Sequence, residues 1–400
     1  MSIVDDNNNF DRVLLQHESP NNPTKRSWRW QWPLLTITFI VSLIVITMLV
    51  NIHFSSSHKN LQQSINNENI YSSTKHQTFI SNTEPRRDIH GNIMDIHDGN
   101  ILFYNNLYYY YGTGYGKCIE INSTSGCDGA VFGESCGFHY NHNLSLFTSN
   151  DLMTWTPAPE PPFQIARDFP LPNIVMFCTK VIYNINTKKF ILWFNWNTNK
   201  GFIGVAESIS PFGPFKVVNQ QINTLERDWP SDFGLYQDEE TGDGFVIYSG
   251  QNIVNIESVT RDFYETLGAV NSSQQIGPTY VEAPAMFKRN NLYYASTGAE
   301  CCYCQQGSAA VLYVASHPLG PYSNITVLSA NAKSQQTDIT KYYDSDGNEH
   351  FIYRGDMWQQ SPDHLKAHDP TYFGLIHWVN DIPQPLIYQA NFTLDVGIKN

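Results

Sequence analysis

Apolar and polar residues alternate in short runs along most of the chain after residue 86, and Asn, Asp and Gly separate the runs. One unit recurs: an apolar strand, a polar turn, and an aromatic strand that ends in a small residue. Its copies are Asn100-ILFYNNLYYYYGTG, Lys180-VIYNINTKKFILWFNW, Leu235-YQDEETGDGFVIYSG, Glu282-APAMFKRNNLYYASTG and Ile339-TKYYDSDGNEHFIYRGDMW. The turns contain the residues that tight hairpins need, so each copy predicts a β-hairpin.

Further strand patterns follow these hairpins. The segment that begins at Leu144 (LSLFTSNDLMTW) comes after the first hairpin, and those that begin at Phe202 and Val311 share a Pro-x-Gly-Pro-aromatic ending. We find no long amphipathic helix pattern among them. Repeated units of this kind predict an all-β fold, a five-bladed β-propeller over residues 86–400. A β-sandwich is the alternative, and it explains the hairpins but not the repeated ending.

A long apolar run lies before these repeats. Pro33–Val50 contains no charged residue, and an apolar stretch of about 20 residues can span a bilayer as a helix. Lys25, Arg26 and Arg29 precede the run, whereas the next Lys or Arg is Lys59. The positive-inside rule therefore predicts a cytosolic N-terminus. A cleaved signal peptide is the alternative, but the leading segment is long and no small-residue cleavage site follows the run.

The segments around this run complete the predicted organisation. Residues 1–31 are predicted to be a polar cytoplasmic tail, and residues 32–54 a transmembrane signal anchor. Residues 55–85 are rich in Ser, Asn and Gln, which predicts a disordered stem. We therefore expect a single-pass type II membrane protein of the secretory pathway, in the Golgi or at the cell surface. Its C-terminal domain is then lumenal or extracellular.

Cysteine residues and glycosylation sequons agree with that orientation. All 7 cysteines lie after the apolar run. So do the Asn-x-Ser/Thr sequons, at Asn122, Asn143, Asn271, Asn324 and Asn391. This distribution is typical of an oxidising, glycosylating compartment and predicts disulfides, although an odd number leaves at least one thiol unpaired or bridging two chains. Zinc at Cys301, Cys302 and Cys304 is the alternative, but no second cluster with metal-ligand spacing accompanies them.

Composition narrows the class of ligand. Aromatic residues make up 14% of the chain and charged residues 15%, and the formal net charge is −13. An acidic chain with no basic stripe beyond residue 30 repels polyanions, so nucleic acid is excluded as a partner. Neutral sugars are compatible with this charge, because the C–H faces of pyranose rings stack on aromatic side chains. We therefore expect a glycan as the partner.

Glu282 is the first candidate for chemistry, because it interrupts the apolar strand pattern of Val281–Phe287. Burying a carboxylate costs several kcal/mol unless the group is paired or protonated. A carboxylic acid that stays protonated in a pocket is what general acid catalysis requires. The alternative is a structural carboxylate paired with Lys or Arg.

Four segments carry a family resemblance. They are Asp88–Ile101, Ser231–Glu239, Glu282–Phe287, and the pair Ser334–Thr337 with Tyr353–Trp358. In this order they resemble motifs on successive blades of glycoside hydrolase family 43, the five-bladed propellers that cut arabinan, xylan and galactan side chains. The likeness covers about residues 86–395 and is greatest to the exo-β-1,3-galactanase branch.

The resemblance implies catalytic roles for a small set of residues. Glu282 takes the position of the general acid, and Asp232 that of the aspartate that tunes the acid and helps to orient the sugar. Gln335 takes the place of a glutamine that holds the nucleophilic water in this branch, which lacks the usual first-blade aspartate base. His97 stands where that aspartate would be, and the adjacent Asp98 is a candidate substitute base.

Other residues are candidates for sugar binding. His97 is expected in the pocket, and Tyr115 and Trp358 are candidate stacking platforms. Asp356 is a candidate acceptor for a sugar hydroxyl or a partner of Arg354. No cofactor is required and we assign no metal ligand, although some relatives hold an ion on the propeller axis.

Two positions depart from the branch. Phe177-Cys178-Thr179 stands where the branch has Glu-Arg-Pro, so a second-blade carboxylate is replaced. Thr113, at the end of the first hairpin, replaces a sugar-binding Glu. Both replacements remove carboxylates that the resemblance links to the galactose substrate of the branch.

These residues predict an inverting glycoside hydrolase that removes terminal neutral sugars, β-galactosyl or pentosyl, from glycans. A glycan-binding pseudoenzyme of the same fold is the alternative, because of the two replaced carboxylates. A Golgi glycosyltransferase is a third hypothesis, suggested by the topology alone.

Overall fold

A computed structural model describes most of the chain after residue 75. The described residues are 76–120, 131–140, 142–169, 171–197, 201–225, 230–250, 253–268, 276–278, 281–299, 303–329 and 333–398. The predicted tail (1–31), membrane span (32–54) and most of the predicted stem lie outside them. Within the described ranges, no helix is long and apolar enough to cross a membrane.

Five antiparallel sheets form the body. The first contains β2 (His97–Tyr104), β3 (Leu107–Gly114), β4 (Asn143–Ser149) and β5 (Thr156–Pro157), and β6 (Phe163–Gln164) also pairs with β4. The second contains β7 (Val175–Asn184), β8 (Lys189–Asn197), β9 (Gly201–Ser208) and β10 (Lys216–Asn219). The third contains β11 (Pro230–Gln237), β12 (Gly244–Gly250) and β13 (Ile253–Val259).

The fourth sheet contains β14 (Val281–Arg289), β15 (Leu292–Ala299), β16 (Ala310–Ala315) and β17 (Ser323–Ser329). The fifth contains β18 (Gln335–Tyr343), β19 (Glu349–Asp356) and β20 (Thr371–Leu375). A two-stranded sheet of β21 (Trp378–Val379) and β22 (Ile382–Pro383) follows. The described helices are short: α2 (Ile165–Asp168) and the 3₁₀ turns Cys136–Phe138 and Lys366–His368.

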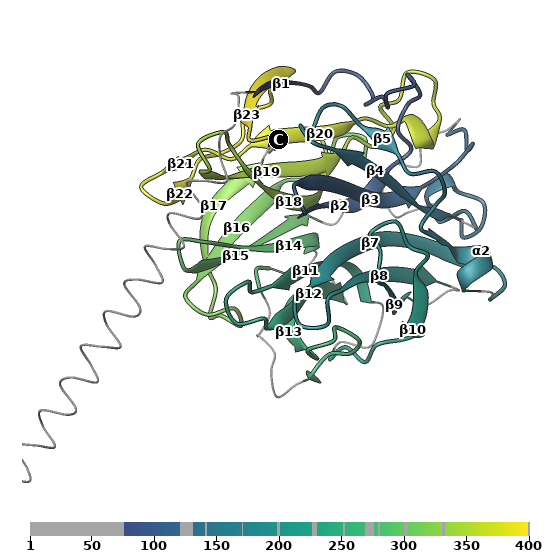
Figure 1. Cartoon of the computed structure of the whole chain (residues 1–400), viewed down its shortest axis with the longest axis horizontal. Coiled ribbons are helices and arrows are strands. Elements are labelled where there is room, and N and C mark those ends of the chain that lie inside the picture. The colour runs from purple at the N-terminus through teal and green to yellow at the C-terminus, as the bar shows by residue number, and fades with distance from the viewer. Residues whose placement is uncertain are drawn as a thin grey trace, which may run out of the picture. The chain divides into compact units, whose positions relative to one another are not determined.

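The first strand of each sheet lies nearest the centre of the molecule (Figure 1). Contacts run from β2 to β7, on to β11, β14 and β18, and back to β2, so the five sheets close into a ring. This arrangement confirms the predicted five-bladed propeller. Each predicted hairpin forms the first two strands of a blade, and the third and fifth blades have three strands rather than four in the described part of the chain.

A separate two-stranded sheet contains a strand that the sequence pattern missed. β1 (His76–Ser81) pairs with β23 (Asn391–Val396), in a register that joins His76 to Val396 and Ser81 to Asn391. Asn82 then bonds both ways with the backbone of Phe373 in β20. The predicted stem (55–85) therefore ends too late, because residues 76–85 belong to the folded body. Its polar composition hid a strand that only its pairing with the chain's other end stabilises.

Two of the hairpin turns show why the sequence folds in this way. Asn105-Asn106 links β2 to β3, and Asn290-Asn291 links β14 to β15. All four residues have positive φ, between 48° and 63°. Asn tolerates this left-handed conformation, and two-residue hairpin loops with the twist of neighbouring strands need it at both positions.

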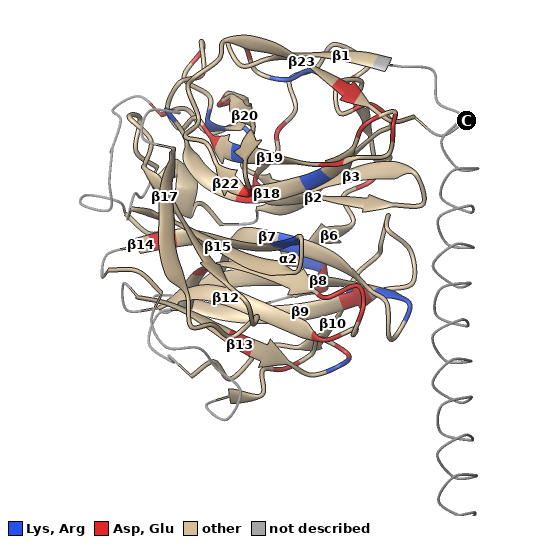
Figure 2. Cartoon of the chain, turned by 90° about the vertical axis from the view of Figure 1, so that its left-hand side faces the viewer, with Lys and Arg blue, Asp and Glu red and all other residues tan. Residues whose placement is uncertain are grey.

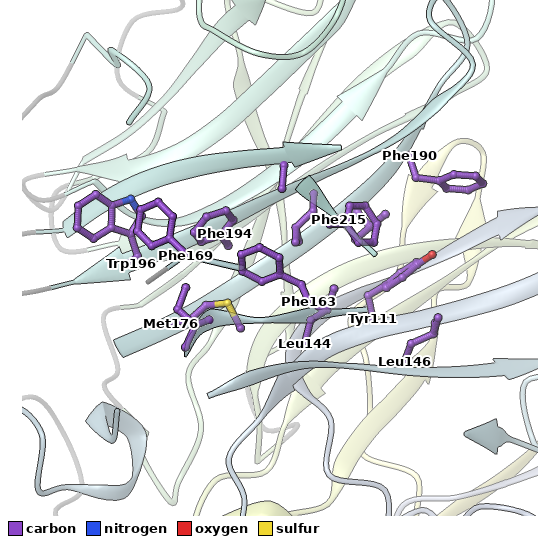
Figure 3. Close-up of a cluster of buried hydrophobic side chains, with 14 of the residues drawn as sticks. Tyr111, Leu144, Leu146, Phe163, Phe169, Met176, Phe190, Phe194, Trp196 and Phe215 are labelled. Atoms are coloured by element: carbon purple, nitrogen blue, oxygen red, sulfur yellow. The ribbon is translucent and has the colours of Figure 1, made fainter. Parts of the chain in front are cut away.

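The core lies between neighbouring blades. One buried cluster joins β3 and β4 of the first blade to β7 and β8 of the second, and Figure 3 shows Tyr111 and Leu144 on one side of it and Phe190 and Phe194 on the other. Comparable clusters lie between the other consecutive blades, and the one between the fifth and first also takes in β1 and β23. Because middle strands such as β8 and β12 are buried on both faces, they read as nearly continuous apolar runs. The blades thus form a rigid wall around the inner strands.

Candidate active site

Every inner strand is irregular near its beginning. The pairing register shifts between His97 and Asn100 in β2, Phe177 and Lys180 in β7, Pro230 and Phe233 in β11, Glu282 and Ala285 in β14, and Gln336 and Asp338 in β18. A β-bulge bends a strand and re-aims its side chains. Asp98, Cys178 and Ala283 occupy these bulges with positive φ, of 52°, 45° and 51°. Left-handed backbone is costly for residues such as Cys178 and Ala283, and it persists only where the surrounding structure holds it.

Bonds between the bulges bring the predicted residues of different blades together. The Asp98 Oδ2 atom accepts a hydrogen bond from the Cys178 N–H at 2.6 Å. Likewise, Asp232 Oδ2 accepts from the Ala283 N–H, next to Glu282, at 3.2 Å. The beginnings of the inner strands therefore meet at one end of the ring, where carboxyl groups far apart in the sequence converge.

Asp98, Asp232 and Asp356 form a cluster that we call the aspartate corner. The Asp98 N–H donates to Asp356 Oδ2 at 2.6 Å, and burial together with the charges of Asp232 and Asp356 raises the pKa of Asp98 to about 8. Burial also raises the pKa of Asp232, although the Lys180 charge opposes it. Asp98 and Asp232 keep a partly exposed surface, whereas Asp356 is buried. The corner therefore holds more carboxyl groups than can all be ionised at neutral pH.

Lys180 is the cation beside this corner. Its buried ammonium donates to the backbone oxygens of Gly99 and Thr337, at 2.9 and 2.8 Å. These bonds tie β7 to β2 and β18 just below the bulges. The sequence pattern overlooked Lys180, although a charged residue within an apolar strand is the same signal that drew attention to Glu282.

Glu282, Gln335 and Trp358 form a second group, which we call the glutamate corner. Gln335 Nε2 donates to Glu282 Oε1 at 2.6 Å, and Trp358 Nε1 donates to Gln335 Oε1 at 2.6 Å. The indole N–H can only donate, so it sets the orientation of the Gln335 amide and directs its NH₂ group at Glu282. Glu282 is partly exposed, while Gln335 and Trp358 are 9% and 2% exposed. Glu282 is therefore held by two side chains that are almost completely buried.

His97 lies between the two corners. Its ring is fully buried, with Nδ1 at 3.7 Å from Asp356 Oδ1 and the ring centroid at 5.6 Å from that of Trp358. Burial lowers the pKa of His97, but Asp356 and Asp95 outweigh this effect and raise it. Protonation of the imidazole would balance part of the negative charge of Asp356.

The structure brings all the predicted site residues together but changes the position of some. His97, Tyr115, Asp356 and Trp358 are 0, 4, 1 and 2% exposed, so they line the support beneath the site rather than its open surface. Tyr115 and Trp358, predicted as stacking platforms, are packed beneath Tyr303 and Lys366 in this structure. Asp356 bonds the backbone of Asp98 instead of pairing with Arg354, which instead approaches Asp338 at 4.0 Å.

The two replaced carboxylates differ in their surroundings. Thr113 is fully buried. Phe177 is partly exposed, and its ring lies 6.5 Å from that of Phe138, which lies 5.7 Å from the ring of Tyr303. Phe177 immediately precedes a bulge, as Glu282 does, so an apolar ring stands at the level of the carboxyl groups.

Among the described residues, one cysteine near the site lies in a group of possible metal-ligand atoms. Cys178 Sγ lies with oxygens of Asp98 and Asp232 inside a group whose atoms are all within 4.8 Å of one another. Burial raises the pKa of the Cys178 thiol well above its usual value, which favours the neutral thiol over the thiolate that binds metals. Cys118 and Cys136 form a disulfide, and Cys304 is also disulfide-bonded. The zinc alternative involves Cys301 and Cys302, which lie outside the described residues.

Known proteins show the same architecture. Residues 93–359 match the family model of glycosyl hydrolases family 43. A β-D-galactofuranosidase of Aspergillus niger is 27% identical over an alignment of 229 residues, which covers 52% of this chain and 64% of that protein. The chain thus spans less than two thirds of that relative's length.

Solved structures add to the evidence for the fold. An exo-β-1,3-galactanase from Clostridium thermocellum superimposes with a TM-score of 0.65 at 20% identity, covering 80% of this chain and 67% of the other. An exo-β-1,3-galactanase from Phanerochaete chrysosporium, solved with β-1,3-galactotriose, has a TM-score of 0.63 at 19% identity and covers 80% and 69%. At these identities the likeness establishes the fold.

Proposed function

The chain belongs to glycosyl hydrolases family 43, and from this premise we propose that it hydrolyses O-glycosyl bonds and releases terminal β-galactosyl or pentosyl residues from glycans with inversion. One observation carries the proposal. Glu282, Asp98 and Asp232 are partly exposed residues at the beginnings of three inner strands, while the residues that hold them are buried. Convergent carboxyl groups on a rigid support are what this chemistry needs.

Glu282 is the general acid of the proposed reaction. Gln335 donates to its Oε1 atom, so the proton of the acid form resides on Oε2. From there it passes to the oxygen of the departing group as the glycosidic bond breaks. Protonating that oxygen removes the need to expel an alkoxide, which supports a rate gain of about 10²–10⁴-fold.

Asp98 is the proposed base that activates water on the opposite face of the sugar. It acts in its ionised form, which a pKa of about 8 leaves in the minority at neutral pH. In inverting enzymes the two carboxyl groups stand about 6.5–9.5 Å apart, to leave room for the sugar and the water. Asp98 and Glu282 lie on β2 and β14, which are not neighbours in the ring. Gln335, in contrast, donates a hydrogen bond directly to Glu282. This contact supports a role for Gln335 beside the acid, and it leaves Asp98 as the candidate that activates the water.

The proposed substrate class follows from two kinds of observation. The relatives named above act on galactofuranosides and β-1,3-galactans, which supports a galactosyl group. Phe177, beside Phe138, offers an apolar ring where the branch has a carboxylate. Such a ring stacks on the C–H face of a sugar and cannot accept a hydrogen bond from a hydroxyl group as a carboxylate does. For this reason the proposal includes pentosyl groups as well as galactosyl groups.

The test is turnover of aryl glycosides by the purified chain beside a Glu282→Gln variant. Aryl β-galactopyranosides, β-galactofuranosides, β-xylosides and α-arabinosides cover the proposed sugars. We expect release from at least one of them by the wild type and a large loss in the variant, with NMR showing the inverted anomer first. Equal rates for both proteins would reject the assignment.

A glycan-binding pseudoenzyme remains the second candidate, because Thr113 and Phe177 remove two carboxylates of the branch. A glycan array separates the two functions. Binding without product release supports the pseudoenzyme, and the absence of binding removes it.

A lumenal or extracellular location of the body is part of the proposal. The Cys118–Cys136 disulfide suits an oxidising compartment, and the sequon residues Asn324 and Asn391 are exposed on β17 and β23. We expect a mobility shift of the cellular protein on treatment with an N-glycan amidase. A protein that does not shift would contradict this location.

A further inference from the structure

A fully buried lysine lies behind the glutamate corner. The Lys366 ammonium is 3.8 Å from the centre of the Trp358 ring and 4.1 Å from that of Tyr303. Asp369 and Glu120 are its carboxylate partners, at 3.5 and 3.6 Å. Burial lowers the pKa of Lys366, and both carboxylates oppose that effect. The reaction proposed above assigns this costly buried charge no role.

The position of Lys366 is fixed from two sides. Its backbone N–H donates to the Cys118 oxygen at 3.0 Å, and Cys118 is tied to Cys136 by a disulfide. Asp369 accepts from the backbone N–H groups of residues 359–361, which directly follow Trp358. The ammonium is thus held rigidly on the indole face.

From Lys366 a continuous line of contacts leads to Glu282. A cation over the indole face draws electron density from the ring, which strengthens the Nε1–H donor toward Gln335. Donation to Gln335 Oε1 in turn polarises the amide, and its NH₂ group becomes a better donor to Glu282. Each bond in the line is short, at 2.6 Å.

We propose that Trp358 and Lys366 are positioning residues for Glu282: they fix the Gln335 amide, and so hold the carboxyl with its Oε2 atom toward the leaving oxygen. This inference rests on the function proposed above. It also has a consequence for pH, because a donor to a carboxylate favours the charged form, so removing that donor favours the protonated form.

Several charged groups enter the same pH profile. Asp369, Glu120 and Asp356 act on Lys366, and the phenols of Tyr115 and Tyr303 lie against it. Asp232, on β11, accepts a hydrogen bond from the residue that follows Glu282, and its charge raises the pKa of Asp98. In the proposed reaction Asp98 must be ionised and Glu282 protonated, so protonation of the base sets the acidic limb and ionisation of the acid sets the basic limb.

The first test is Trp358→Phe in the full chain, which removes the indole N–H but keeps an aromatic ring beside Lys366. We expect kcat on an aryl glycoside to fall about tenfold or more with little change in KM, and the basic limb of kcat/KM to move to higher pH. Trp193→Phe is the matched control, since Trp193 is fully buried and its Nε1 donates to the Phe263 oxygen at 2.8 Å, between the second and third blades. Both variants lose one indole bond, and only Trp358→Phe should move the basic limb.

The second test is the double variant Lys366→Met with Asp369→Asn. It removes the cation together with its partner carboxylate Asp369, so no buried carboxylate is left at residue 369 without its cation. It should move the basic limb in the same direction as Trp358→Phe. A basic limb that stays in place in Trp358→Phe and in the double variant would overturn the proposal, and so would an equal shift in Trp193→Phe. Turnover by the wild type would still support the proposed function in either case.

A spectroscopic measurement separates the proposal from the function. The indole N–H resonance of Trp358 should titrate with pH in the wild type and lose that titration in Glu282→Gln, whether or not substrate is turned over. A resonance that behaves identically in both proteins would also overturn it.

Discussion

The two corners of the site hold carboxyl groups by opposite means. In the glutamate corner, Glu282 receives a hydrogen bond from a neutral amide whose orientation a buried indole sets. In the aspartate corner, Asp98 and Asp232 are crowded by each other and Asp356, and Lys180 is the nearby cation. One corner fixes the direction of a carboxyl, and the other sets how readily a carboxyl loses its proton. A general acid must point at the leaving oxygen, and a base must have a suitable pKa. The comparison therefore assigns the acid to the glutamate corner and the base to the aspartate corner.

The charged residues of the rest of the body contrast with both corners. In Figure 2 the Lys, Arg, Asp and Glu residues are scattered over several strands and loops, and most strand residues are uncharged. Pairs such as Lys341 with Glu239 lie at the surface, where solvent screens them. Crowded carboxyl groups with raised pKa values are typical of functional sites.

The largest expected effect breaks the glutamate corner at its end. Glu282→Gln should lower kcat by about 10²–10⁴-fold on an aryl glycoside with a poor leaving group, because acid assistance is lost. A leaving group that departs readily as an anion needs little assistance, so the loss should be much smaller with a dinitrophenyl glycoside. Steady-state rates on the two substrates provide the measurement. A loss of equal size on both would remove Glu282 as the acid.

Next in size, Asp98→Asn should break the aspartate corner. We expect a loss of kcat of about 10²-fold or more, since an amide does not take a proton from water. Unlike the loss in Glu282→Gln, this one should not depend on the leaving group. Recovery of the rate with the dinitrophenyl glycoside alone would contradict the division between the corners.

A smaller change sharpens the comparison through pH. Asp232→Asn removes a negative charge that helps to raise the pKa of Asp98 to about 8. Asp98 should then ionise at lower pH, and the acidic limb of kcat/KM should move toward lower pH, while the basic limb stays in place. Profiles of the variant and the wild type test this expectation, and an unmoved acidic limb would count against Asp98 as the base.

The smallest expected effect concerns stability. Because the pKa of Asp98 in the folded protein, about 8, is above its ordinary value near 4, the folded state keeps a proton that the unfolded chain releases. Stability should therefore fall as the pH rises through this window. Asp98→Asn lacks this loss, so its melting temperature should exceed that of the wild type by a few degrees near pH 9, and the two should converge near pH 4. A difference that does not depend on pH would contradict the raised pKa.

Much of the fold was predictable because its signals are local. The hairpins combine Asn, Asp and Gly turns with aromatic strands, and both are visible within some twenty residues of sequence. β1 was not predictable in this way, because its polar residues form a strand only through pairing with β23, more than three hundred residues away. Likewise, Glu282 was visible as a charge in an apolar strand, whereas Lys366 lies in a short 3₁₀ turn and its role depends on aromatic rings from distant segments. The exposure of Trp358 and Tyr115 could not be derived either, because it depends on which rings cover them.

The pairing of β1 with β23 has a consequence for how the chain could be rearranged. His76 and Val396 are direct partners in that ladder, so the two ends of the folded body are adjacent. A short flexible linker between them would close the polypeptide into a circle, and new ends could then be opened at an exposed hairpin such as Asn290-Asn291. A circular permutant of this kind should keep every blade and both corners, which would show that the order of synthesis is not what assembles the ring.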